Sequence, residues 1–211
     1  CWVLGQDPSR RIICASYSAE LALKFARDCK IIMGSKWYKA TFPNTHLGRS
    51  AEQDLITTRM GGRYATSVGG SLTGRGGNII IIDDPMKPQE AQSESARKAT
   101  QQWFDGTVYS RLDSKADDVI ILVMQRLHVD DLVAHVLETG DWVHLNLPAI
   151  ATVDQVFERS GGRRFTRRAG ELLHPEREAQ HVLVEVRWVV GSFKFEAVYQ
   201  QQPVPAEGYL L

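Results

Sequence analysis

Two adjacent carboxylates, Asp83 and Asp84, follow directly after a run of four isoleucines in the segment NIIIIDDP. An apolar run of this length, bounded by turn residues, predicts a strand buried on both faces, and Pro85 prevents the strand from continuing. The two acids therefore stand at the carboxyl end of a buried strand. Carboxylates at such a position can hold a divalent cation and orient a water molecule for attack. A turn in which the acids simply face water is the structural alternative.

Short strands alternate with helices around this pair, which predicts an α/β fold with a mostly parallel central sheet flanked by helices. Ligands of such sheets gather outside the carboxyl ends of the strands, where the two acids would lie. Residues 151–175 are rich in Gly, Arg and Ser and are expected to be a linker or a long insertion. The predicted strands are residues 10–17, 63–70, 78–84, 117–125 and 141–150, and the predicted helices are residues 19–34, 90–112, 130–140, 176–190 and 192–202.

Composition limits the partners and the compartment of the chain. The 211 residues hold 25 basic and 25 acidic side chains, so any site for a polyanion must be local. No apolar run approaches the length of a membrane span. The three cysteines lack the spacing of a metal site or of a disulfide framework, which fits a reducing compartment.

A buried strand that ends in two acids is typical of the Walker B element of nucleoside triphosphatases, in which the first acid holds Mg²⁺ and the second position orients or deprotonates the attacking water. Together with other segments in the same order, this stretch resembles the large terminase subunit, the genome-packaging ATPase and nuclease of tailed bacteriophages. The resembling segments are RIICASYSAELALKFARD, GGSLTGRGGNIIIIDDPMKPQEAQSE, ILVMQRLHVDDL, GDWVHLNLPAI and FEAVYQQQPVPAEG, and they span nearly the whole chain.

This resemblance implies a P-loop NTPase core of the additional-strand type (ASCE, RecA-like), which hydrolyses ATP with Mg²⁺. Residues 1–150 would form the ATPase core. Residues 151–211 would form an Arg- and Gly-rich linker and short helices that lead to a nuclease domain outside this chain. The full-length protein would translocate double-stranded DNA into a procapsid and cleave concatemeric DNA.

The resemblance also implies roles for the two acids. Asp83 matches the Walker B acid that holds Mg²⁺, usually through the water ligands of the ion. Asp84 falls where many members of the family carry a catalytic Glu, and its side chain is shorter by one methylene. Asp84 is therefore expected either to act as the base or to position the attacking water.

A coupling element of the family resembles the segment MQRLH, at the end of the strand predicted over residues 117–125. There Gln125, Arg126 and His128 would sense the γ-phosphate and relay hydrolysis to DNA movement. Arg126 and His128 match the usual form of the element, whereas Gln125 departs from it but can still hydrogen-bond water or phosphate. The alternative is a solvated turn between a strand and a helix.

Arg75 lies eight residues before Asp83, in a glycine-rich loop whose backbone can approach another group closely. A guanidinium at this place can stabilise charge on a γ-phosphate and bind ATP. In related packaging motors an arginine just before the Walker B strand acts in this way from the neighbouring subunit, which implies that Arg75 is an arginine finger. A flexible loop whose arginine faces water is the alternative.

The phosphate-binding motif GxxxxGK[ST] does not occur in the chain. In the family this Walker A segment precedes the strand matched here by RRIICASY, so it is expected upstream of Cys1. The acids of the nuclease domain are expected beyond Leu211. The chain by itself is therefore expected to bind ATP poorly.

The implied partners are double-stranded DNA, the portal protein, the terminase small subunit and further copies of the chain in a homo-oligomeric ring on the procapsid. No membrane is involved, and the implied location is the cytoplasm of the bacterial host. Two other functions stay open: a helicase-type DNA-dependent ATPase, and a catalytically inactive prophage remnant that acts as an interaction module. A two-metal nuclease needs further acids, but Asp113, Asp117 and Asp118 stand before a strand, at the wrong edge of the sheet.

Five arginines cluster in the segment that is expected to be a linker. Arginine pairs bidentately with phosphate, so the cluster could contact a DNA backbone. Arginine-rich loops are more often solvated, and this is the alternative. The five residues are Arg159, Arg163, Arg164, Arg167 and Arg168.

Overall fold

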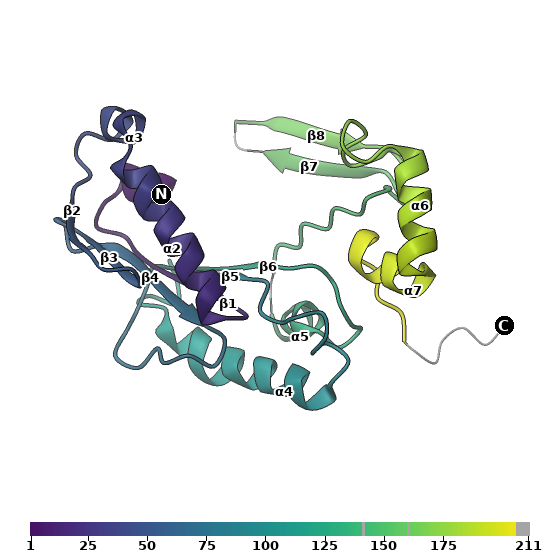
Figure 1. The fold of residues 1–211 in the computed structure, drawn as a ribbon, viewed down its shortest axis with the longest axis horizontal. Helices are drawn as coiled ribbons and strands as arrows, with labels where there is room; N and C mark the ends of the chain where they lie inside the picture. The colour runs from purple at the N-terminus through teal and green to yellow at the C-terminus, as the bar shows by residue number, and fades with distance from the viewer. Residues whose placement is uncertain (141, 160, 206–211) are drawn as a thin grey trace. The chain divides into compact units, whose positions relative to one another are not determined.

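The isoleucine run forms strand β5 (Ile79–Asp83) of a six-stranded sheet (Figure 1). The strands lie in the order β2-β3-β4-β1-β5-β6. Strands β4, β1, β5 and β6 are parallel, whereas β2 and β3 pair antiparallel with their neighbours. The predicted α/β fold with a mainly parallel sheet is therefore confirmed. The other strands are β1 (Arg11–Ser16), β2 (Leu47–Ser50), β3 (Asp54–Thr57), β4 (Gly62–Ser67) and β6 (Val119–Val123).

The computed structural model describes residues 1–140, 142–159 and 161–205. The chain divides into two compact units, Cys1–Met124 and Gln125–Leu211. The six-stranded sheet belongs to the first unit. The functional boundary predicted between residues 150 and 151 stays a prediction.

Strand β5 lies inside the sheet, between β1 and β6. Ile80 and Ile82 are fully buried on one of its faces, and Ile79 and Ile81 are partly buried on the other. Pairing on both edges satisfies the backbone of β5, and this is why an uninterrupted apolar run can form it.

Strand β6 differs from the prediction that residues 117–125 form a buried strand. Within the described part of the chain β6 pairs only with β5 and is the last strand of the sheet. Val119, Ile121 and Val123, which alternate along the strand and share one of its faces, are 47%, 45% and 51% exposed. The apolar sequence of β6 thus belongs to an edge strand in this chain.

Helix α2 (Ala19–Gly34) covers one face of the sheet and has the bounds predicted for it. It begins after Ser18, whose hydroxyl accepts a hydrogen bond from the Leu21 N–H, as an N-cap should. Its apolar side joins a core that also includes α1 (Trp2–Gln6) and α3 (Lys36–Thr41), two helices that the sequence analysis does not predict. The buried members of this core are Leu4, Ile12, Cys29, Met33, Tyr38, Phe42 and Leu55.

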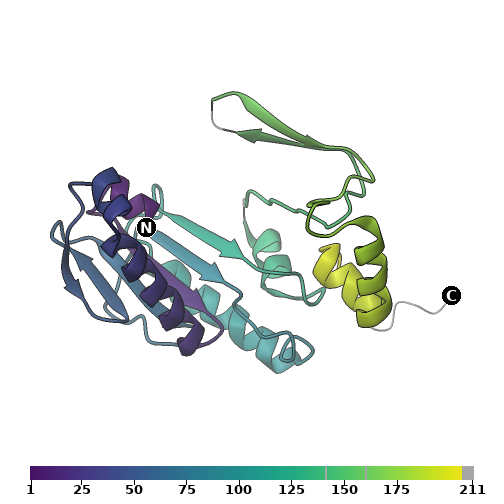
Figure 2. The same ribbon diagram turned by 45° about the horizontal axis from the view of Figure 1, so that its top comes forward.

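The helix predicted over residues 90–112 is shorter and changes type along its length. Helix α4 (Glu94–Trp103) continues into a π-helical turn, η1 (Phe104–Val108), and a 3₁₀ turn, η2 (Tyr109–Arg111). Trp103, Phe104 and Val108 are buried along this stretch. In Figures 1 and 2 α4 lies on the side of the sheet away from α2, so helices flank the sheet on both faces.

The second unit is built from helices and one hairpin. Its helices are α5 (Leu132–Thr139), α6 (Gln180–Val190) and α7 (Ser192–Lys194), and α7 continues into the π-helical turn η3 (Phe195–Tyr199). The side chains of Ala149, Leu183 and Phe195 form its buried cluster. Predicted helices 176–190 and 192–202 therefore exist, with later starts or earlier ends.

One prediction about this unit is wrong. No strand forms over residues 142–150; the Ala149 N–H donates to the Tyr199 carbonyl, and Ile150 makes only an isolated bridge to Leu172. Asp141, the first residue of that predicted strand, lies outside the described residues. Residues 151–175, expected to be a linker or a long insertion, contain the antiparallel hairpin of β7 (Gln155–Arg159) and β8 (Arg163–Arg167), which was not predicted.

Among the described residues, none of the helices has the length and apolar character that crossing a bilayer requires.

Candidate active site

The carboxyl ends of three parallel strands meet at Asp83. Asp83 is the last residue of β5 and lies in register with Ser16, the last residue of β1, and with Val123, the last residue of β6. This is the edge at which parallel sheets bind their ligands. The sequence-based placement of Asp83 at the carboxyl end of a strand inside the sheet thus agrees with the structure.

Asp84 ends the strand in a left-handed backbone conformation. Its φ angle is 46°, a region in which Asp and Asn are enriched among residues with a Cβ. Its N–H donates to the Val123 carbonyl at 2.9 Å, and its own carbonyl accepts from the Tyr17 N–H at 3.0 Å. Hydrogen bonds to both neighbouring strands therefore fix the backbone that carries the second carboxylate.

Neither carboxylate has a partner within the described chain. The side chains of Asp83 and Asp84 accept no hydrogen bond and form no ion pair with any described residue, although both are only partly exposed. Burial, and secondly the negative charge of Asp84, raise the pKa of Asp83. Two acids held together without a counter-charge form a site that a cation would stabilise.

The donor set suits one kind of cation. The described residues contain no cluster of three or more His, Cys, Asp or Glu side chains able to hold a metal ion. Mg²⁺ keeps several water ligands and binds through one or two carboxylates together with phosphate oxygens. The pair Asp83 and Asp84 fits Mg²⁺ bound largely through water, and it does not form a complete protein cage.

Arg75 is held at the other end of β5, before the strand begins. Its Nη1 donates to Asp54 Oδ2 at 3.3 Å, and its guanidinium lies 3.7 Å from the centroid of the Tyr64 ring. Because β5 has five residues and a strand rises about 3.3 Å per residue, the structure does not bring Arg75 together with Asp83. Its assignment as an arginine finger toward a neighbouring subunit stays a prediction.

A cavity of about 220 Å³ adjoins this arginine. The side chain of Arg75 is 42% exposed, so it faces solvent while it stacks on Tyr64. Gly74 (φ 72°) supplies the left-handed turn of the loop. The residues that hold Arg75, Asp54 and Tyr64, were not expected, since nothing in their local sequence marks them as partners of a loop so far along the chain.

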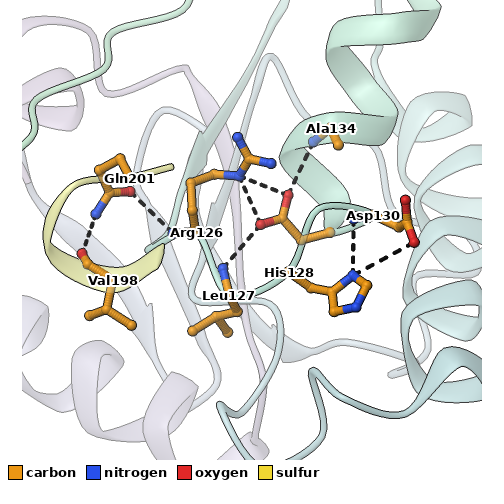
Figure 3. Close-up of polar contacts among 8 residues, drawn as sticks. Arg126, Leu127, His128, Asp130, Ala134, Val198 and Gln201 are labelled. Atoms are coloured by element: carbon orange, nitrogen blue, oxygen red, sulfur yellow. Dashed lines mark hydrogen bonds and ion pairs between the residues drawn. The ribbon is translucent and has the colours of Figure 1, made fainter. Parts of the chain in front are cut away.

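Arg126 is anchored by a buried acid at the start of the second unit (Figure 3). Its Nε donates to the Asp131 carboxylate oxygens at 3.0 and 2.8 Å. The same carboxylate accepts from the Leu127 and Ala134 N–H groups, both at 3.1 Å, and so caps α5. The side chains of Arg126 and Asp131 are 15% and 3% exposed. This arrangement fixes the arginine in one orientation.

The remainder of the predicted coupling element lies around this ion pair. The two Nη nitrogens of Arg126 make no hydrogen bond to another described residue, which leaves them for a ligand. His128 Nδ1 accepts from the Asp130 N–H at 3.0 Å (Figure 3). Gln125 is an exposed residue. Asp131 was missed as a site residue, and its position just before an apolar helix was the signal that could have identified it as a cap.

Three comparisons with known proteins bear on this site. No protein-family model matches the chain, and no curated protein matches it. Among solved structures the chain is similar to the crystal structure of the HK97 bacteriophage large terminase, with a TM-score of 0.50 and 15% sequence identity. The match covers 92% of this chain and 40% of that chain. At this identity the likeness shows a terminase-like fold, and the chain spans well under half the length of its neighbour.

Proposed function

We propose that this chain is part of the ATPase motor of a phage terminase large subunit, with a P-loop NTPase core whose magnesium and water side is formed by Asp83 and Asp84. One observation carries the proposal. Two partly buried acids without a cationic partner in the described chain stand where three parallel strands end. The terminase-like fold of the neighbouring structure supports the proposal.

In this function Asp83 would hold Mg²⁺ through water ligands, and the ion would supply positive charge to the phosphates of ATP. Asp84 accepts a hydrogen bond from the attacking water. The water oxygen forms the new bond to the γ-phosphorus, the bond from that phosphorus to the bridging oxygen breaks, and ADP and phosphate result. The water proton passes to Asp84 or to a phosphate oxygen.

The exposed edge of β6 is a second support. An apolar strand with an unpaired edge is a place where a further strand adds. A parallel strand beside β6 would pair with its open backbone edge and would end at the same edge of the sheet as Asp83. We assign this position to the strand of the Walker A segment, whose phosphate-binding loop would then face the two acids.

Within the coupling element, Arg126 is the residue whose side chain is held in one orientation by an ion pair. Asp131 holds its Nε and leaves both Nη groups for a phosphate oxygen or a water molecule. In the proposed motor Arg126 reads the presence of the γ-phosphate, with Gln125 and His128 beside it in the chain. Arg75 acts as the finger from a neighbouring copy in the ring.

The activity of the whole protein follows only as part of this proposal. The motor would move double-stranded DNA into a procapsid, with the portal protein and the terminase small subunit as partners, in the bacterial cytoplasm. A helicase-type ATPase and an inactive prophage remnant stay alternatives. An intact Walker A lysine in the complete protein would separate the motor from the remnant.

The decisive experiment measures DNA-stimulated ATP hydrolysis by a protein that contains this chain and its Walker A segment. Asp83→Asn should lower the turnover number by about 100-fold or more, since a metal ion contributes several kcal/mol to transition-state stabilisation. The matched control is Asp28→Asn on the exposed side of α2, which should keep full turnover. Wild-type turnover in Asp83→Asn would remove the metal assignment.

A mixing experiment tests Arg75 separately. Arg75→Ala and Asp84→Asn proteins should each hydrolyse ATP slowly. If Arg75 acts across subunits, mixed rings contain intact sites and recover part of the lost activity. No recovery on mixing would exclude the action of Arg75 on a neighbouring copy.

A further inference from the structure

The hairpin of β7 and β8 carries a local excess of positive charge, although the net charge of the whole chain is zero. Residues 155–168, which we call the basic hairpin, contain five arginines and one glutamate, whereas the whole chain has 25 basic and 25 acidic residues. Every basic residue of the hairpin is arginine, the side chain that pairs bidentately with phosphate. This local excess is what a site for a polyanion requires.

The basic hairpin is a regular two-stranded ribbon. Its five pairs run from Gln155 opposite Arg167 to Arg159 opposite Arg163. Gly161 and Gly162, with φ angles of 79° and 71°, allow the chain to reverse at the tip. Figures 1 and 2 show the ribbon extending away from α6 and α7. A ribbon of this kind has the width that the major groove of duplex DNA admits.

Buried contacts hold the base of the ribbon in place. Arg167 is 2% exposed, and its Nη2 donates to the carbonyls of Pro148 and Glu171 at 2.9 and 3.1 Å. The Ala169 N–H donates to Asp154 Oδ1 at 2.8 Å. Arg167 is thus a structural residue, and the interpretation that it contacts DNA is wrong. A fixed base reduces the entropy lost when the ribbon binds a ligand.

Arg163, Arg164 and Arg168 of the hairpin are exposed to solvent and can contact a ligand. Arg163 and Arg168 are exposed, and their side chains form no hydrogen bond or ion pair with another described residue. Arg164 Nε donates to Glu158 Oε1 at 2.7 Å, with both side chains more than half exposed. The side chain of Arg159 lies outside the described residues. Exposed ion pairs are weak, so Arg164 can exchange Glu158 for a phosphate at little cost.

The middle of the ribbon is stiffened by aromatic packing. The rings of Phe157 and Phe165 stack with their centroids 6.0 Å apart and an interplanar angle of 22°. These rings are directly opposite each other in the strand pair, at its third position. Gly161 and Gly162 at the tip carry no apolar side chain. A ribbon that inserted into a bilayer would need an apolar tip, so the charge favours phosphates in water.

We propose that the basic hairpin is a DNA-binding arm, with Arg163 and Arg168 contacting the phosphate backbone of a duplex and Arg164 joining them when DNA replaces Glu158. The choice of DNA over other polyanions rests on the proposed function, whereas the location of the contact rests on the hairpin itself. The contact is independent of base sequence because it is made to phosphates.

Binding of a labelled 25-base-pair duplex to the 211-residue chain, measured by fluorescence anisotropy from 50 to 200 mM salt, tests this arm. Each lost phosphate contact lowers the slope of log K against log salt by about 0.9, so Arg163→Ala with Arg168→Ala should reduce the slope by about 2 and weaken binding about 10-fold or more at low salt. Arg49→Ala with Arg177→Ala removes two exposed arginines outside the hairpin and is the matched control. Circular dichroism checks that both double variants are folded.

Three outcomes would overturn the proposal: no binding by the wild-type chain at 50 mM salt, an unchanged slope in the hairpin variant, or an equal loss in the control variant. Vesicles that contain anionic lipid form a further arm of the experiment, and binding to vesicles without binding to DNA would also overturn it. The same titration with Asp83→Asn needs no ATP. If Asp83→Asn kept wild-type ATP turnover while the chain bound DNA through the hairpin, the metal assignment would fail and the DNA-binding arm would remain supported. If Asp83→Asn abolished ATP turnover but the hairpin variants bound DNA normally, the arm would fail and the ATP site would remain supported.

Discussion

Asp83 and Asp84 in the first unit and Asp131 in the second are all partly or fully buried acids, yet their surroundings are opposite. The Asp131 carboxylate receives two hydrogen bonds from Arg126 and one each from the Leu127 and Ala134 N–H groups. The carboxylates of Asp83 and Asp84 receive none from the described chain. Asp83 and Asp84 are only partly exposed and have no cationic partner in the described chain, so their paired charge favours the binding of a cation.

The arginines of the second unit also differ in whether their side chains have partners within the described chain. Arg167 is buried and bound to backbone carbonyls, while Arg163 and Arg168 are exposed without a partner in the described chain. Arg126 combines both properties, since its Nε is bound to Asp131 and its two Nη nitrogens bind no other described residue. The contacts of Asp131 and of Arg167 Nη2 thus contribute to the scaffold of the second unit, whereas Arg163 and Arg168 lie where DNA is proposed to bind.

The largest expected effect on stability comes from replacing Asp131, the acid whose carboxylate is fully hydrogen-bonded. Asp131→Ala should lower the free energy of unfolding of the second unit by about 3–5 kcal/mol, because it leaves the Arg126 guanidinium without its counter-charge and removes the cap of α5. Asp131→Asn keeps a capping oxygen and should lose less. Urea denaturation followed by tryptophan fluorescence measures both changes.

The control is Asp130→Ala, one residue earlier in the chain, whose side chain is 70% exposed. It should change the free energy of unfolding by less than about 0.5 kcal/mol. If Asp131→Ala were no more damaging than Asp130→Ala, the ion pair would not hold the second unit together, and the contrast between satisfied and unsatisfied acids would fail.

The next effect concerns the backbone beneath the second acid. Asp84→Glu should lower the free energy of unfolding by roughly 1 kcal/mol, because residues other than Gly, Asn and Asp are strained at a φ of 46°. Asp84→Asn should be neutral or slightly stabilising, since Asn tolerates the same conformation. Thermal unfolding of the two variants side by side provides the measurement. Equal stability of both variants would show that the backbone at residue 84 does not select the shorter acid.

This strain favours Asp or Asn over Glu at position 84, and the local sequence alone does not reveal it. The left-handed backbone of residue 84 is held by hydrogen bonds to Tyr17, directly after β1, and to Val123 of β6. This constraint depends on strands that are distant in sequence.

Elements whose signals are local in sequence could be predicted, whereas elements that depend on distant strands could not. Helix α2 was predicted to its exact bounds because its N-cap Ser18, its apolar periodicity and its end at Gly34 are all local signals. Strand β5 was predicted because its four isoleucines and Pro85 are local as well. The edge position of β6 was not predicted, because exposure depends on which strands exist beside it and not on its own residues.

The hairpin was missed for a related reason. In residues 155–167 arginines occupy both faces of the ribbon, so the alternation of apolar and polar residues that marks a strand is weak. The buried pairing of Arg167 with the Pro148 and Glu171 carbonyls reverses the usual expectation that arginine lies outside. The ion pair of Arg126 with Asp131 spans only five residues, but no sequence rule distinguishes it from two exposed charges.

The smallest expected effect has the opposite sign to the others. Asp83→Asn should raise the free energy of unfolding at pH 7 by less than about 1 kcal/mol, because it removes the repulsion between the two acids and the burial of a charge. Thermal unfolding in the absence of Mg²⁺ should show a rise in Tm of at most a few degrees. The matched Asp28→Asn variant, which breaks an exposed ion pair with Lys24, should not show such a rise.

The pH dependence of this gain follows from the raised pKa of Asp83. A raised pKa in the folded chain means that ionised Asp83 opposes folding, so its penalty is fully present above the folded pKa. The penalty decreases as the pH falls through that raised pKa, and it vanishes below the ordinary value of 3.8, where Asp83 is protonated in both the folded and the unfolded chain. The Tm difference between Asp83→Asn and wild type should therefore shrink toward zero as the pH is lowered from 7 to below 3.8. Millimolar Mg²⁺ at pH 7 should shrink it as well, because the cation stabilises only the wild-type pair. A Tm difference that stayed constant with pH would mean that the negative charge of Asp83 does not oppose folding, and the carboxyl edge of β5 would then lack the electrostatic character of a cation site.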